Sequence, residues 1–194
     1  MPKRKPYLPP DIVPHPRYGS RIRPGFGGVS EAQLRNSFRG YLDATIFPES
    51  TIRANTSEQN GGVMTVRPYY VDILKKCQTC ECHFIFFAME QQFWYETLKF
   101  YIDADCNDCC ECRKTQQADR RRFKQYSELA AEANLTNDQL TTFVEISLEL
   151  WNDGTLTNAQ PLRRLKNLAM KRLPDHPLTA AIEKFANELP ASAG

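Results

Sequence analysis

The sequence lacks the features that mark several large functional classes. No apolar run approaches the roughly 18 residues of a membrane-spanning helix. The basic residues among the first ten positions precede no apolar segment, so we expect no signal peptide. Neither sign of charge dominates, because 25 Lys and Arg stand against 23 Asp and Glu. Composition therefore predicts a cytoplasmic protein that does not bind membranes, and net charge alone does not indicate a nucleic-acid binder.

Histidine is scarce, and the usual catalytic patterns are missing. The three histidines are His15, His83 and His176, and none accompanies a recognisable nucleophile. The glycine-rich stretch at 25–28 lacks the Gly-Lys-Ser/Thr ending of a phosphate-binding loop. The His-x-Glu and Pro-Cys-x-x-Cys pattern of zinc deaminases is also absent. The sequence therefore predicts no enzymatic activity.

Cysteine is confined to one segment. All seven cysteines lie between Cys77 and Cys112. Their odd number and the expected reducing compartment favour metal binding over a disulfide framework. Cys77-x-x-Cys80 forms the first pair, and Cys106-x-x-Cys109-x-x-Cys112 contains two overlapping pairs at the other end. The intervening segment exceeds the usual gap of about 15–20 residues between such pairs, as expected if it contains a helix.

Two Cys-x-x-Cys pairs on tight turns supply the four thiolates of a tetrahedral structural zinc site. We favour Cys109 and Cys112 as the second pair, because the following Arg113 and Lys114 add positive charge that favours thiolates. Cys106 is the alternative ligand. The pattern predicts one structural Zn²⁺ in a closed site, since four thiolates leave no open position for a substrate.

Three cysteines are left over if the second pair is Cys109 and Cys112. Cys82, Cys106 and Cys110 are then expected to be spare thiols or small buried apolar residues. The alternative is that these three thiols exchange with the zinc ligands or take part in a redox-sensitive release of zinc. His83 is expected to be a surface or hydrogen-bonded residue.

Residues beyond the cysteines carry a resemblance to a known family. They are Phe84-x-Phe86, Glu90-Gln91, Trp94-Tyr95-Glu96, Phe100 and Arg113. Together with the two cysteine pairs they resemble the bacterial "probable zinc-ribbon" domain family over roughly residues 69–114. The resemblance implies zinc binding through Cys77, Cys80, Cys109 and Cys112, and it implies no enzymatic activity. Glu81 departs from the pattern, because a glycine, which suits a left-handed turn position, commonly follows the second cysteine.

The first half of the chain contains few clear elements. Seven of the thirteen prolines precede residue 25, so residues 1–28 are expected to be extended without a regular element, with a flexible glycine turn at 25–28. Ser30-Glu-Ala-Gln33 predicts a capped helix over about 31–42, with Leu34, Phe38 and Leu42 on one stripe. A polar connector is expected at 49–62.

Strands and one helix are expected around the first cysteine pair. Residues 63–66 and 69–73 are β-prone, and a strand is expected at 83–87. Residues 88–98 predict a helix whose apolar face is formed by Met89, Phe93, Trp94 and Leu98.

Residues 113–189 contain no cysteine, and their sequence predicts helices. Apolar spacing predicts helices over 120–133, from a capping box at 136–139 to Trp151, from about 157–160 to about 173, and over 178–189. These short helices need one another's apolar faces, so a small bundle is expected.

The predicted fold class is therefore α+β, a small zinc ribbon with an inserted helix followed by an all-helical C-terminal region. The expected segments are 1–29 (extended), 30–68 (helix and connector), 69–114 (zinc ribbon) and 115–190 (helical bundle).

Two binding functions fit this organisation. The first is a protein-interaction or adaptor module, with the helical region as its docking surface. The alternative is binding of nucleic acid or a ribonucleoprotein through a cationic cluster after the last cysteine. The candidate contacts are Arg113, Lys114, Arg120, Arg121, Arg122 and Lys124.

Overall fold

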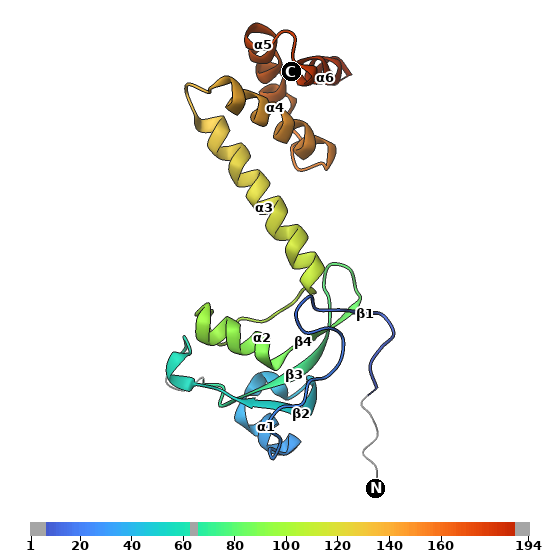
Figure 1. Cartoon of the computed structure of the whole chain (residues 1–194), viewed down its shortest axis with the longest axis vertical. Coiled ribbons are helices and arrows are strands. Elements are labelled where there is room, and N and C mark those ends of the chain that lie inside the picture. Colours follow the sequence, from blue (N-terminus) through green and yellow to red (C-terminus); the bar gives the residue numbers. More distant parts are fainter. Residues whose placement is uncertain (1–6, 63–65, 189–194) are drawn as a thin grey trace. The chain divides into compact units, whose positions relative to one another are not determined.

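The computed structural model describes residues 7–62 and 66–188 (Figure 1). The chain divides into two compact units, Met1–Thr115 and Gln116–Gly194. The first contains a mixed sheet and the clustered cysteines, and helices make up the second, which confirms the α+β class. Most of the β-prone stretch expected at 63–66 lies outside the described residues. In the described part of the chain, no helix is both long and apolar enough to cross a bilayer.

A four-stranded sheet forms the centre of the first unit. Its strands are β1 (Ile12–Val13), β2 (Thr45–Arg53), β3 (Tyr69–Lys76) and β4 (His83–Phe86), in the order β1-β4-β3-β2. β3 pairs antiparallel with both neighbours, and β1 pairs parallel with β4. The β3–β4 hairpin is the element that carries the first cysteine pair at its turn.

The N-terminal segment is more regular than its prolines suggest. The expectation of no regular element is wrong at β1, which adds an edge to the sheet where proline does not interrupt pairing. Further on, the Gly25 N–H donates to the Glu49 carbonyl at 2.8 Å. A Cβ on Gly25 would lie 2.0 Å from the Thr51 carbonyl oxygen, so this close approach to β2 requires glycine.

The capped helix after this segment is shorter than expected. The box is confirmed, because the Gln33 N–H donates to Ser30 Oγ at 3.3 Å and the Ser30 N–H donates to Gln33 Oε1 at 2.9 Å. The helix α1 (Glu31–Ser37) then ends, and a short 3-10 turn, η1 (Arg39–Tyr41), follows. Leu42 therefore leaves the helical stripe and is exposed.

Strand β2 was not predicted. Its residues were expected to end the preceding helix at Ile46-Phe47-Pro48 and to begin a polar connector at 49–62. The pairing of β2 with β3 is irregular between Phe47 and Ile52, and this irregularity accommodates the proline. A second 3-10 turn, η2 (Thr56–Glu58), follows β2.

The helix inserted between the cysteine pairs consists of α2 (Ala88–Gln92) and a π-helical turn, η3 (Phe93–Thr97). Its predicted apolar face is wrong for Met89, Phe93 and Leu98, which are 46%, 43% and 45% exposed. The buried residues of the helix are instead Ala88, Glu90, Gln91 and Tyr95, so its sheet-facing side does not follow the apolar residues.

The side of this helix that faces the sheet is partly polar. Gln91 is fully buried, and its Nε2 donates to the Val71 carbonyl at 2.7 Å and the Phe86 carbonyl at 2.9 Å. Tyr95 is also buried, and its hydroxyl donates to the Ala104 carbonyl at 2.6 Å. Motif residues of this helix therefore satisfy backbone groups of neighbouring segments.

The second unit is built from the end of α3 (Cys110–Ala131) and from α4 (Asn137–Asn152), α5 (Ala159–Arg172) and α6 (Pro177–Glu188). The capping box at 136–139 is confirmed at the start of α4. The buried core comprises Leu135, Leu140, Val144, Leu162, Leu165, Ala169 and Ile182. α3 begins ten positions earlier than predicted, because residues 110–119 have no apolar stripe to indicate a helix.

A buried carboxylate in β3 positions the start of α2. Asp72 is 1% exposed, and it accepts hydrogen bonds from the Ala88 N–H at 2.7 Å and the Arg23 N–H at 3.2 Å. Burial nevertheless raises the pKa of Asp72 to about 6, above its ordinary 3.8.

This raised pKa predicts a specific pH dependence of stability. The folded chain binds more protons than the unfolded chain between about pH 4 and pH 6, so the contribution of Asp72 falls as the pH rises through this window. With zinc in excess, the unfolding free energy of Asp72→Asn relative to wild type should rise by about 1–1.5 kcal/mol from about pH 5, where the thiolates still hold zinc, to about pH 7. Denaturant titrations measure this difference, and a constant difference would contradict the assignment.

Candidate metal centre

The first cysteine pair lies on the turn that connects β3 to β4. The Cys77 N–H donates to the Cys82 carbonyl at 2.9 Å, and the Glu81 N–H donates to the Cys77 carbonyl at 3.1 Å. Glu81 adopts a φ of 61°. The glutamate thus occupies the left-handed position for which a glycine was expected.

The second pair lies at the start of a helix. The Cys109 carbonyl accepts a hydrogen bond from the Arg113 N–H at 3.0 Å, and Cys112 is in the first turn of α3. The expectation that both pairs occupy turns is therefore wrong for the second pair. Burial is the main cause of a raised pKa at both Cys109 and Cys112, so a bound zinc would have to drive the loss of these thiol protons.

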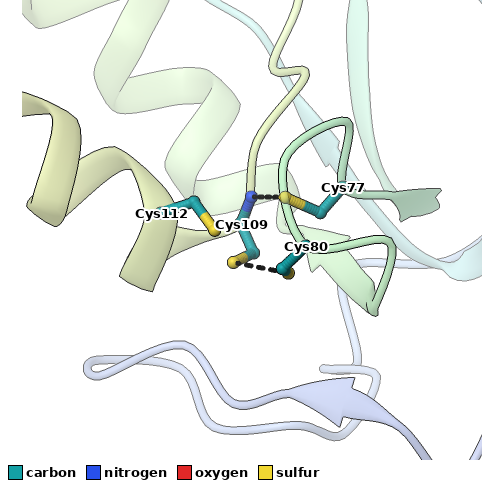
Figure 2. Close-up of side chains that lie close together, drawn as sticks. All are labelled: Cys77, Cys80, Cys109 and Cys112. Carbon is teal, nitrogen blue, oxygen red and sulfur yellow. Dashed lines mark hydrogen bonds between the residues drawn. The ribbon is translucent and has the colours of Figure 1, made fainter. Parts of the chain in front are cut away.

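These two segments bring four sulfur atoms together (Figure 2). The Sγ atoms of Cys77, Cys80, Cys109 and Cys112 all lie within 4.8 Å of one another, and Cys80 Sγ is 3.9 Å from Cys109 Sγ. A tetrahedral zinc with bonds of about 2.3 Å to sulfur requires sulfur atoms about 3.8 Å apart. The four thiols therefore fit a structural zinc site.

Hydrogen bonds hold the two segments in register. The Cys109 N–H donates to Cys77 Sγ at 3.3 Å, and the Gln78 N–H donates to the Asn107 carbonyl at 3.0 Å. Asp108 Oδ1 accepts from the Thr79 hydroxyl at 2.7 Å and from its N–H at 3.2 Å. The protein thus supplies the second layer of contacts that orients metal ligands.

The thiols differ in their surroundings. Cys77 and Cys109 are buried, whereas Cys80 is exposed and Cys112 is half-buried. The Cys82 backbone N–H lowers the pKa of Cys80 to about 7, which favours the thiolate that zinc requires.

The three remaining cysteines lie outside this four-sulfur cluster. Cys106, the alternative ligand, is buried, and its Sγ contacts the Asp108 carbonyl at 3.4 Å. Burial raises the pKa of Cys106 to about 12, so this thiol stays protonated. The Cys110 Sγ contacts the Pro14 carbonyl at 3.4 Å. Cys82 precedes β4, and its pKa is raised, chiefly by the Cys80 side chain.

A buried ion pair connects the metal-binding segment to α2. Arg113 Nη2 donates to Glu90 Oε1 at 2.6 Å, and its guanidinium lies 5.0 Å from the Trp94 ring centroid. Glu90 Oε1 is also 3.6 Å from His15 Nε2. This connection was missed in the sequence, where Glu90 was only a motif residue of the family resemblance. The motif residues Glu90, Trp94 and Arg113 are thus explained by one cluster beside the metal site.

The six candidate nucleic-acid contacts differ in their burial and in their ion pairs. Arg113 is the largely buried partner of Glu90. Arg122 lies 3.1 Å from Glu149 and 3.2 Å from Asp153. The side chains of Lys114, Arg120, Arg121 and Lys124 are exposed on α3, and Lys124 lies 3.7 Å from Glu128.

Replacing one ligand tests the metal site. Cys77→Ser should reduce zinc well below one atom per chain and abolish cooperative unfolding of the first unit, because structural zinc contributes roughly 10–16 kcal/mol of apparent binding free energy in small zinc domains. Metal analysis and circular dichroism measure both effects. Cys82→Ser is the matched control and should keep the zinc. Equal zinc content in the two variants would contradict the assigned ligands.

The left-handed turn position gives a second prediction. Glu81→Gly should raise the unfolding free energy by about 0.5–1 kcal/mol, because glycine adopts positive φ without the steric cost of a Cβ. Glu81→Ala is the matched control, since it removes the same Lys76 contact but keeps the Cβ. Thermal and denaturant unfolding compare the two, and equal stability would show that the turn carries no such cost.

Comparison with known proteins agrees with this geometry. The model of the family described as "Probable treble clef domain" matches residues 71–121, about a quarter of the chain. Searches of curated proteins and of solved structures gave no match. The expected zinc domain is thus supported, although as a treble clef and not as a ribbon with two turns. Residues 71–121 are similar to a probable treble clef domain, and the four clustered cysteines of this segment form the candidate zinc site.

Proposed function

We propose that the chain is a non-enzymatic zinc protein that acts as a protein-interaction module. Zinc has a structural role in this proposal, because an all-thiolate shell closes the coordination sphere. Bound zinc would supply folding energy and fix the β3–β4 turn against α3. The binding surface must then come from residues around this rigid centre.

The observation that carries the proposal is an exposed apolar surface on the inserted helix. We call the side chains of Met89, Phe93, Leu98, Phe100 and Tyr101 the aromatic surface; each is at least 42% exposed. Met89 and Phe93 are four positions apart, and the Leu98 N–H donates to the Phe93 carbonyl. Methionine and aromatic residues are enriched at protein interfaces, and exposed apolar patches mark binding sites. This composition favours a partner protein with an apolar contact surface.

The aromatic surface supports docking better than the C-terminal helices do. Those helices were the expected docking surface, but most apolar side chains of α4, α5 and α6 pack in their own core. The inserted helix instead leaves Phe93 and Leu98 exposed while it buries Gln91. The proposed interface therefore lies on the zinc-containing unit.

Nucleic-acid binding is the second candidate. The observation that favours it is the pair Arg120 and Arg121, which are exposed on one helix and form no ion pair with any described residue. Three of the six candidate cations, Arg113, Arg122 and Lys124, are already paired with carboxylates. The remaining charge is modest for phosphate binding, so we rank this function below protein interaction.

Affinity capture with point variants tests the protein-interaction proposal. Full-length wild type should retain a partner, and Phe93→Ser/Leu98→Ser should reduce its recovery roughly tenfold or more, since central apolar side chains dominate interface energies. Met170→Ser is the control, because Met170 is 42% exposed on α5 in the other unit. Equal recovery with all three proteins would contradict the proposal. Zinc content and thermal melting should confirm that each variant is folded.

Gel-shift binding to RNA and DNA at two salt concentrations tests the alternative. If it is correct, binding weakens steeply with salt and is lost in Arg120→Ala/Arg121→Ala. Arg164→Ala/Lys171→Ala removes two exposed cations from α5 and should bind like wild type. Absence of binding at low salt would exclude this function.

A further inference from the structure

Arg67 is a buried cation without a carboxylate partner. Its residue is only 5% exposed, and no described Asp or Glu forms an ion pair with it. Its Nε is buried and has no hydrogen-bond partner. Buried charges in proteins are normally paired, because removal of an unpaired charge from water is costly. Arg67 therefore presents an incomplete site.

The surrounding residues hold this side chain in place. The Gln59 side chain accepts from the Arg67 N–H at 2.9 Å and donates to the Arg67 carbonyl at 2.7 Å. The guanidinium carbon lies 3.8 Å from the Phe38 ring centroid, 4.6 Å from that of Tyr95 and 5.8 Å from that of Tyr41. These rings stabilise the positive charge through their faces, but they leave the Nε–H without an acceptor.

Arg67 lies in the wall of a cavity of about 850 Å³. Phe38 and Tyr41 line the same cavity, so the guanidinium and two of its aromatic neighbours belong to one concave surface. This volume is within the range of small-molecule sites. The cavity can therefore hold a ligand that reaches the cation.

The other charges of the cavity identify the class of ligand. Lys75 is neutralised by Asp105 at 2.5 Å, and Lys76 lies 3.0 Å from Glu81. The exposed carboxylates of Asp43 and Asp103 also line the cavity. They disfavour a multiply charged anion such as a phosphate, whereas a single carboxylate matches the planar fork of one guanidinium.

We propose that this cavity binds a carboxylate, with Arg67 as its recognition residue and the half-buried ring of Phe38 against the apolar body of the ligand. The carboxylate belongs to a small organic acid or to the C-terminus of a peptide, since both present the same group. Arg67 and Phe38 belong neither to the aromatic surface nor to the zinc ligands, and the proposal does not depend on which macromolecule the protein binds.

Nuclear magnetic resonance on the zinc-loaded full chain tests the site directly. The Arg67 Nε–H signal should shift when benzoate is added, because this donor gains an acceptor or a neighbouring charge. Inorganic phosphate should bind far more weakly. A short peptide with a free C-terminal carboxylate and its amide distinguish the sources: binding of the free peptide alone indicates a C-terminus, and binding of benzoate alone indicates a small acid.

Matched variants separate recognition from folding. Arg67→Met should weaken benzoate binding roughly ten- to hundredfold, as expected for loss of a charge-assisted hydrogen bond. Arg39→Met removes an exposed cation of the same cavity and should bind within a fewfold of wild type. If Arg67→Met loses zinc or fails to fold, Arg67→Lys replaces it, because lysine keeps the charge but lacks the fork. An unshifted Arg67 signal at tens of millimolar benzoate, equal binding by the Arg67 variant, or equal binding of phosphate would each overturn the proposal.

Discussion

The first unit depends on one constraint, namely that four sulfur atoms lie within 4.8 Å of one another. Two come from a hairpin turn and two from the start of α3, so the cluster fixes the sheet against the helix. Cys77 and Cys109 also pack in the apolar core with Leu34, Phe84 and Phe86. A bound zinc would therefore stabilise the core as well as the turn, which is how small domains compensate for limited apolar burial.

Buried polar side chains complete this small core. Asp72 fixes the start of α2, Gln91 connects that helix to two strands, and Glu90 pairs with Arg113 beside the metal ligands. Each of these contacts is directional and specifies one arrangement of the elements. Arg67 differs, since its charge faces aromatic rings and has no carboxylate partner among the described residues. A buried charge with a partner of opposite charge, as in Glu90–Arg113, serves the structure, whereas a buried charge without one, as at Arg67, marks a candidate ligand site.

Local sequence patterns predicted the features that depend only on residues close together in the chain. The Cys-x-x-Cys spacings and the capping boxes at Ser30 and Thr136 required only neighbouring residues. Strand β2 could not be predicted, because its pairing with β3 overrides the local effect of Pro48. The early start of α3 was hidden by a polar sequence, and the apolar face predicted for the inserted helix was wrong because this helix turns the polar Gln91 toward the sheet. The environment of Arg67 arises from contacts distant in sequence, so no local pattern indicates it.

X-ray absorption at the zinc edge of protein purified without oxygen tests the central claim most directly. The account predicts about one zinc per chain with four sulfur ligands at about 2.3 Å. Absence of zinc, or a coordination shell containing nitrogen or oxygen ligands, would contradict it.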